Sequence, residues 1–229
     1  MKKTYNTEHI IDSFYSKGNT KFLNATEFLH VKNRIPKSLQ NIYLPFPDAS
    51  KRIIYKKNIP NICICKITFN SSIKHSMILK ELFNLGLKEE TYGDIIVDDN
   101  IAYVYIFTDL YEDIKYNFTL NKISIKKIEL LDKDYLSDFQ IEYEELELLV
   151  SSLRLDNIIS SITNDSRKSV LDRFKNKEII INYEVATKPS IIIEENDVFS
   201  IRKYGKYKYN KILKNTKKGG FIISVSKYK

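Results

Sequence analysis

The sequence predicts an α+β protein of three consecutive segments, and three observations lead to that prediction. Apolar residues recur at helical spacing in several short stretches, β-branched runs bounded by turn residues lie between them, and the charge changes sign twice. Residues 1–60 carry a net charge of +7, residues 61–149 carry −8 and residues 150–229 carry +9. We therefore expect a basic N-terminal helical segment and loop over 1–60, an acidic domain over 61–148 and a basic domain over 149–229.

The N-terminal segment reads as two helices followed by a loop. A Gly-Asn pair at 18–19 separates two apolar clusters, and Asn24 or Thr26 is a candidate cap for the second helix. The stretch PFPDASKR, 45–52, holds two prolines that prevent regular structure. Its basic end, Lys51 and Arg52, suits contact with a phosphate, although a solvated loop explains the same residues equally well.

The acidic segment predicts the order strand, helix, strand, strand, helix, strand. The expected strands are 61–69, 93–97, 101–107 and 122–129, and the expected helices are 74–85 and 109–116. This order is the split βαβ arrangement of ferredoxin-like and RNA-recognition-like domains, which many functions share. The acidic balance argues against this sheet as the main platform for RNA, and residues 131–147 are expected to bridge to the last domain.

Two short helices with capping serines open the basic domain. The first has an apolar face at i, i+3, i+4 and i+7, formed by Leu155, Ile158, Ile159 and Ile162, with Ser152 as the candidate cap. Ser166 is the candidate cap of the second helix, which buries Val170, Leu171 and Phe174. We expect this helix pair to pack on a small sheet.

Both helices carry cations in the first turn. Arg154 lies near the first helix start, and Arg167 and Lys168 open the second helix. Because helix N-termini are partially positive, cations there are mildly unfavourable, and an anion held by backbone N–H groups and arginine would compensate. The alternative is that the arginines pair with Asp156 and Asp165, and the sequence leaves both interpretations open.

The rest of the basic domain alternates strands with charged turns. The expected strands are 179–182, 190–193 and 198–201. The stretch that follows, RKYGKYKYNKILKNTKKGG, interleaves lysine and tyrosine around a turn at Gly205. Lysines suit a nucleic-acid backbone and tyrosines suit base stacking, so Lys203, Tyr204 and Lys206 are candidate RNA contacts.

Catalytic and metal chemistry are not indicated. The two cysteines, Cys63 and Cys65, lie two apart in an apolar run and read as buried structural residues, and the three histidines are scattered. The six glycines form no G-x-G cofactor loop. There is no apolar run of about 20 residues and no secretory signal pattern. We expect a cytoplasmic protein without cofactor, metal site, catalytic residues or membrane contact.

The C-terminal motifs resemble a known domain. The series L-R-L-D, S-R-K-S, a strand ending in Asn, a Pro and N-D-V-x-S-I is similar to the RNA-binding domain named after small-subunit ribosomal protein four. In that domain two helices pack on a small sheet and the helix starts meet RNA. The resemblance implies RNA-facing residues and supporting residues: Arg154, Arg167, Lys168 and Lys175 in the first group, and Asp156, Ser166 and Asn182 in the second. The chain departs from the pattern at Lys177, usually Gly, and at Asn196-Asp197, usually Gly-Asp.

A second resemblance covers the full length. The phrase GLKEETYGDIIV, 86–97, with its Gly93-Asp94 pair, is similar to the YlmH-type RNA-binding proteins of Gram-positive bacteria. The resemblance implies a non-catalytic factor that binds ribosomal RNA of the large subunit and tRNA in quality control of stalled peptidyl-tRNA. We expect it to act as a monomer without a small-molecule substrate. The alternative is an RNA-modifying enzyme or its RNA-specificity subunit.

Overall fold

The computed structural model describes residues 7–182, 184–217 and 219–228, and the chain divides into two compact units. The units are Met1–Gln140 and Ile141–Lys229. Each unit contains both helices and β-sheet, so the α+β class is confirmed. The division differs from the expected three segments. Residues 1–60 belong to the same unit as the acidic sheet, and the expected boundary after residue 148 falls inside a strand.

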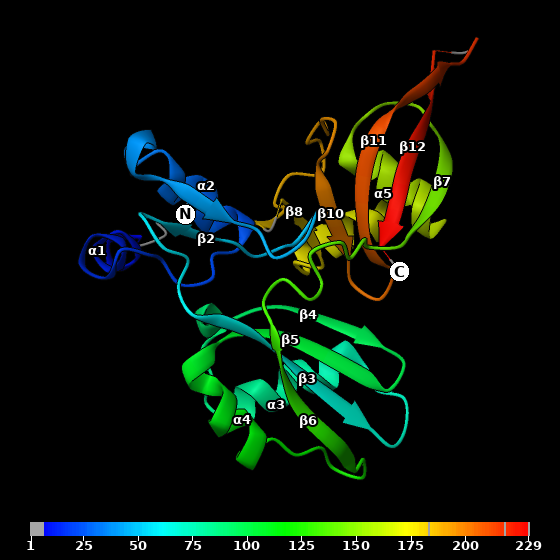
Figure 1. Cartoon of the computed structure of the whole chain (residues 1–229). Helices are drawn as coiled ribbons and strands as arrows, with labels where there is room; N and C mark the ends of the chain where they lie inside the picture. The colour runs from blue at the N-terminus through cyan, green and yellow to red at the C-terminus, as the bar shows by residue number, and fades with distance from the viewer. Residues whose placement is uncertain (1–6, 183, 218, 229) are drawn as a thin grey trace. The chain divides into compact units, whose positions relative to one another are not determined.

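The first unit begins with two helices and a two-stranded sheet, as Figure 1 shows. These elements are α1 (Glu8–Lys17), α2 (Ala25–Lys32), η1 (Lys37–Leu39), β1 (Asn41–Tyr43) and β2 (Ile53–Tyr55). Of the two candidate caps, Asn24 begins α2: its side chain accepts the N–H of Glu27, and the Glu27 carboxylate accepts the N–H of Asn24. Gly18 ends α1 in a left-handed conformation with φ 82°.

A four-stranded antiparallel sheet forms the rest of the first unit. Its elements are β3 (Ile62–Phe69), α3 (His75–Asn84), η2 (Glu89–Thr91), β4 (Tyr92–Asp98), β5 (Ile101–Phe107), η3 (Thr108–Leu110), α4 (Tyr111–Asn117) and β6 (Ile125–Asp132). The strand order is β4-β5-β3-β6. The last strand begins later than expected, because Lys122 takes a left-handed turn conformation with φ 66°.

Both faces of this sheet are covered. The helices α3 and α4 pack Ile78, Leu82 and Ile114 against one face, in a cluster with both cysteines. On the other face Phe22 lies 5.2 Å from Phe107 and Phe46 lies 6.0 Å from Tyr105, measured between ring centroids. A strand buried on both sides needs apolar residues in succession, which explains the run in β3 and why the N-terminal segment is no separate unit.

Gly93 and Asp94 join the N-terminal segment to the sheet. A Cβ on Gly93 would lie 2.8 Å from Phe22 and 2.8 Å from Tyr105. The two carboxylate oxygens of Asp94 accept the N–H groups of Ser50 and Lys51, each at 2.9 Å. The glycine is therefore required by the close approach of two aromatic side chains.

The second unit is a six-stranded sheet with two helices. Its elements are β7 (Tyr143–Val150), α5 (Leu155–Thr163), α6 (Arg167–Lys175), β8 (Ile179–Ile181), β9 (Glu184–Val185), β10 (Val198–Ile201), β11 (Gly205–Asn215) and β12 (Phe221–Tyr228). The strand order is β7-β12-β11-β10-β8-β9. The leucine-rich end of the expected bridging segment is thus the first strand of this sheet, paired with β12 along its full length.

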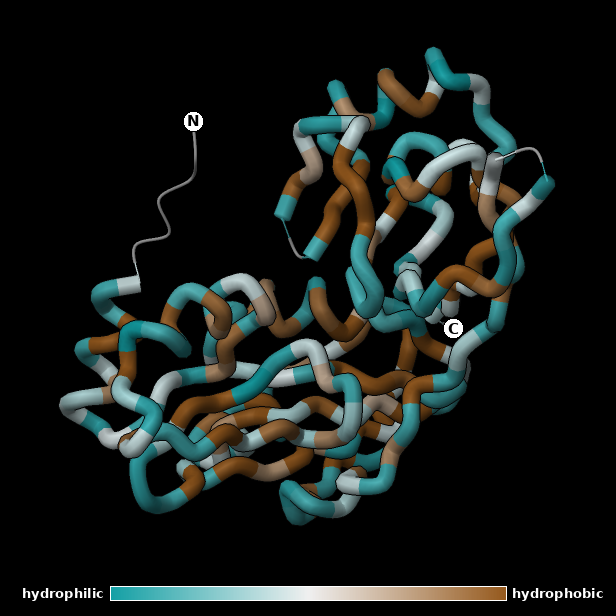
Figure 2. Tube along the Cα trace, turned by 90° about the horizontal axis from the view of Figure 1, so that it is seen from above, coloured by the Kyte–Doolittle hydropathy of each residue, from teal (hydrophilic) through white to brown (hydrophobic). Residues whose placement is uncertain are grey.

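The helices of the second unit bury most of their expected apolar faces, but Ile162 is only partly buried, and Leu171 is partly buried outside the core cluster. Leu155, Ile158 and Ile159 of α5 are fully buried with Val170 and Phe174 of α6. Figure 2 shows hydrophobic and hydrophilic stretches alternating along the trace of the chain.

Two local expectations for the second unit were wrong. The segment 190–193 is not a strand: only Ile192 forms a bridge, to Arg154. Arg154, rather than Ser152, is the N-cap residue of α5. Both differences have one cause. The 189–193 segment runs beside the start of α5, and its carbonyls accept the N–H groups of Leu155 and Asp156.

We predict that Gly93→Ala lowers the stability of the first unit by about 1–3 kcal/mol, because the added methyl group must displace both Phe22 and Tyr105. The difference in thermal unfolding between the wild type and Gly93→Ala measures this loss of stability. Adding Phe22→Leu to Gly93→Ala should cost less than the sum of the single changes, since the smaller side chain makes room. An unchanged melting temperature for Gly93→Ala would contradict the packing described here.

Candidate nucleic-acid interface

The start of α5 is already satisfied within the protein. The N–H of Leu155 donates to the carbonyl of Ile191 at 2.8 Å, and the N–H of Asp156 donates to the carbonyl of Pro189 at 3.1 Å. The Arg154 guanidinium forms a fork with the Asp156 carboxylate, with Nε–Oδ1 at 3.0 Å and Nη2–Oδ2 at 2.6 Å. At this helix the ion-pair interpretation holds, and its first turn offers few free donors to an anion.

The start of α6 is different. The Ser166 side chain accepts the N–H of Ser169 at 3.3 Å, which confirms the expected cap. Arg167 and Lys168 are exposed, and neither has an ion pair with any described residue. Their backbone N–H groups belong to the first turn, where a helix supplies no acceptor. This end of α6 therefore combines two free cations with unsatisfied backbone donors.

The Asp156 carboxylate lies near both helix starts. Its pKa is held below the usual range first by the hydrogen bonds from Arg154, with further help from the N–H of Asn157 and the charge of Arg167, while burial opposes the shift. Arg167 is thus close enough to act on the carboxylate that holds Arg154. Asp156 is a buried residue, 5% exposed, and its carboxylate pairs with Arg154.

Arg173, which the sequence analysis missed, organises the two ends of α6. Its guanidinium lies 2.8 Å from Asp165 and 3.1 Å from Glu178, and it stands 4.9 Å from the ring centroid of Tyr204. Asp165 is therefore taken by Arg173 and does not pair with Arg167. Arg173 sits in the last turn of the helix, where a cation also suits the helix dipole, so sequence alone gave no reason to single it out.

Lys177 occupies a left-handed position directly after α6. The N–H of Lys177 donates to the carbonyl of Phe174, and the N–H of Glu178 donates to the carbonyl of Arg173, which together form a Schellman motif. The φ of Lys177 is 57°, a conformation that favours glycine and costs other residues about 1–2 kcal/mol. The position usually held by Gly is thus left-handed here despite the lysine.

The second unit has another left-handed lysine in the turn between β10 and β11. Lys203 has φ 73°, and the N–H of Arg202 beside it donates to the carbonyl of Glu178 at 3.0 Å. This bond joins the hairpin turn to the turn after α6. Both Arg202 and Lys203 are exposed.

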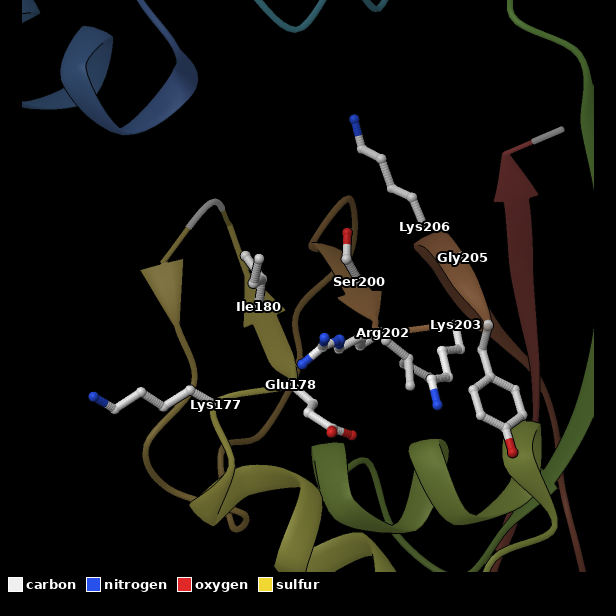
Figure 3. A pocket seen from close by; sticks show the side chains of 10 residues that line it. Lys177, Glu178, Ile180, Ser200, Arg202, Lys203, Gly205 and Lys206 are labelled. Carbon is white, nitrogen blue, oxygen red and sulfur yellow. The ribbon is translucent and has the colours of Figure 1, made fainter. Parts of the chain in front are cut away.

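The two turns border an open hollow of about 620 Å³. Figure 3 shows Lys177 at one side, Lys203 at the other, and Glu178 and Arg202 between them in this view. Ile180, Ser200 and Lys206 also line it. Because Glu178 is engaged by Arg173, the cations of the hollow outnumber its anions.

The remaining candidates of the second unit have more local partners. Lys206 places its ammonium 4.4 Å from the ring centroid of Tyr228, and the exposed Lys175 pairs with Asp172 at 3.0 Å. One face of the Tyr204 ring receives the Arg173 guanidinium, so that face is not open to a base. These three residues lie near α6 or the hollow, and their contact with RNA remains a prediction.

Asn182 supports a turn. Its side-chain Nδ2 donates to Oδ1 of Asp197 at 2.7 Å, and its side-chain Oδ1 accepts the N–H of Val198 at 3.0 Å. Asn196 is left-handed with φ 72°, as its place in the motif implied.

Lys51 and Arg52 lie in the first unit and point into it. The Lys51 ammonium donates to the carbonyls of Glu89 and Tyr92 at 2.5 and 2.9 Å, and burial lowers its pKa against the pull of nearby carboxylates, Glu89 foremost. The Arg52 guanidinium lies 4.8 Å from the ring centroid of Phe28. These contacts stabilise the junction between the N-terminal segment and the sheet, and the expected contact of Lys51 and Arg52 with a phosphate remains a prediction.

Chemical alternatives find little support in the described residues. Cys63 and Cys65 are buried and unbridged, and burial raises the pKa of Cys65 to about 12, so its thiol is unreactive. Within the described ranges no group of three or more His, Cys, Asp and Glu side chains is placed to hold a metal ion. No described helix is both long and apolar enough to cross a bilayer.

We predict that Asp156→Asn destabilises the second unit at neutral pH by about 1–3 kcal/mol, because the Arg154 fork loses its charged acceptor. The folded-state pKa of Asp156 is depressed, so this contribution is present above the unfolded pKa of about 3.9 and is lost as the pH falls through the folded pKa. Melting temperatures of the wild type and the variant should therefore converge in acid.

Asp172→Asn is the matched control, since its partner Lys175 is exposed and the pair should contribute little. A stability difference for Asp156→Asn that stays constant down to strongly acidic pH would show that the charge plays no part.

The family comparison concerns the middle of the chain. Residues 61–145 match the family model described as "Putative RNA-binding domain in YlmH". The charge argument had favoured the basic C-terminal segment as the RNA platform, whereas this description names RNA binding for the acidic sheet. The candidate residues of the second unit lie beyond the matched segment.

Two individual proteins are similar to the chain. It is 30% identical over 161 residues to "Ribosome-associated protein quality control protein P2" of Bacillus subtilis (strain 168), covering 69% of this chain and 62% of that protein. The chain thus matches less than two thirds of this relative. The solved structure "Cell division protein ylmH from Streptococcus pneumoniae" is 16% identical in sequence, with a TM-score of 0.45. The match covers 57% of this chain and 90% of that structure's chain. By the family-model match alone, residues 61–145 are similar to the putative RNA-binding domain of YlmH.

Proposed function

We propose that this protein is a non-catalytic, ribosome-associated RNA-binding factor of the YlmH family. In this role it binds ribosomal RNA of the large subunit and tRNA, acts in translation quality control, and works as a cytoplasmic monomer in a bacterium. The match of residues 61–145 and the similarity to a protein named for ribosome-associated quality control support the proposal.

The start of α6 is the observation that carries the RNA-binding part. Free backbone N–H groups at a helix start attract anions, and Arg167 and Lys168 add charge directly beside them. Within the second unit this arrangement contrasts with α5, whose first N–H groups are bonded internally. The α6 start is therefore proposed as the primary phosphate contact. The second unit, in this proposal, is an RNA-binding domain of the type named after small-subunit ribosomal protein four.

The charge distribution supports the same end of the chain. Residues 150–229 hold 17 Lys and Arg against 8 Asp and Glu. A surface of this kind releases counterions when it meets RNA, so binding should weaken steeply with salt. If about 4–6 phosphates are neutralised, the slope of log K against log[salt] is roughly −3 to −5.

We predict that Arg167→Ala weakens binding to isolated large ribosomal subunits by about tenfold or more, because a charge-assisted phosphate contact is lost. Its melting temperature should stay nearly unchanged, since Arg167 is exposed and has no ion pair with a described residue. Co-sedimentation and thermal unfolding of the same purified variant measure both quantities.

Arg154→Ala is the contrasting variant. It leaves the buried Asp156 carboxylate without its partner, so its main effect should be a lowered melting temperature. Lys211→Ala, an exposed charge on β11, controls for the loss of one positive charge. Unchanged sedimentation of Arg167→Ala would contradict the α6 start as the contact, and modification of the bound RNA by the wild type would favour the alternative that the protein is an enzyme.

A further inference from the structure

We propose that the hollow between the α6 turn and the β10–β11 turn is a second binding site for RNA phosphodiester groups. We name it the turn-lysine site and define it by Lys177, Arg202 and Lys203. The inference rests on the proposed function, because the ligand is the RNA bound there. It assigns a separate contact at the opposite end of α6 from Arg167.

The first argument is conformational. Lys177 and Lys203 both adopt left-handed backbone conformations, with φ 57° and 73°, at turns where glycine would be relaxed. Both line the same hollow. Strained residues that cluster at one place are a reason to look for a function that needs their side chains. Here each side chain supplies a positive charge.

The second argument is electrostatic. Lys177, Arg202 and Lys203 are exposed, and none of them has an ion pair or side-chain hydrogen bond with another described residue. The carboxylate of the hollow, Glu178, is bound by Arg173 at 3.1 Å. Three unpaired cations around an open hollow repel one another, and a polyanion relieves that repulsion.

The third argument is the fixed spacing of the two turns. The N–H of Arg202 donates to the carbonyl of Glu178 at 3.0 Å, so the residues beside the two lysines are tied together by the backbone. The cations therefore sit on a rigid frame although their side chains are long. The nine residues of α6 separate this frame from Arg167 by roughly 12–14 Å along the helix axis, so the two sites are distinct contacts.

The decisive variants are Lys177→Gly and Lys203→Gly, because stability and affinity should move in opposite directions. Removing the left-handed lysine should hold or raise the melting temperature. Binding of fluorescently labelled bulk tRNA, measured by anisotropy, should weaken by about tenfold for the pair of changes. The salt slope should fall by about 1 for each lysine that contacts a phosphate.

Three controls separate backbone, charge and site. Asn196→Gly relieves a left-handed residue of similar φ without losing charge, so affinity should not change. Lys211→Ala removes an exposed charge from β11, away from the residues that line the hollow, and should have little effect. Lys177→Arg keeps the charge and should retain the affinity of the wild type.

The outcomes distinguish this inference from the proposed function. Wild-type affinity in Lys177→Gly/Lys203→Gly, with weakened binding in Arg167→Ala, overturns the turn-lysine site and leaves the proposed function intact. An equal loss in Lys211→Ala also overturns it, since the effect is then one of net charge. Failure of the wild type to bind tRNA or ribosomal subunits overturns both.

Discussion

The Arg173 guanidinium determines how much positive charge the second unit leaves exposed. It binds Asp165 before α6 and Glu178 after it, so one partly buried cation neutralises the carboxylates at both ends of the helix. Arg167 and Lys168 at one end, and the lysine that follows the other end, are left without those partners. The uncompensated surface charge thus depends on an interaction inside the unit.

The cations of this chain fall into two kinds with different physics. Arg154, Arg173 and Lys51 are held by carboxylates or backbone carbonyls and serve the fold. Arg167 and Lys203 are held only at the backbone, and their charges face solvent. For the cations that serve the fold, internal partners offset the cost of losing water. The solvent-facing cations have no such partner, so binding an external anion stabilises them most. Composition counts both kinds alike, which is why net charge indicates a polyanionic partner without locating its contacts.

Local signals were enough to predict most elements of the fold. The strands β5 and β10 match the expected ranges residue for residue, Ser166 caps α6 as expected, and Asn24 is one of the two expected caps of α2. Each of these depends on neighbours within a few positions. What failed depends on distant residues: the carbonyls of 189–191 occupy the start of α5, and Asp94 draws Lys51 inward. The candidate RNA site was predicted only in part for the same reason. The role of Arg173 depends on Asp165, Glu178 and Tyr204, which meet it only in the folded unit.

The pairing of β7 with β12 has a consequence for the order of folding. The hairpins of the second unit, β10–β11 and β11–β12, close short loops, whereas β7 must close a loop that contains nearly the whole unit. Loop closure of that length is entropically costly and slow, so β7 should dock after the hairpins have formed. A fragment that begins within β7 would therefore carry a truncated edge strand, and the natural starting point for an isolated second unit is Ile141.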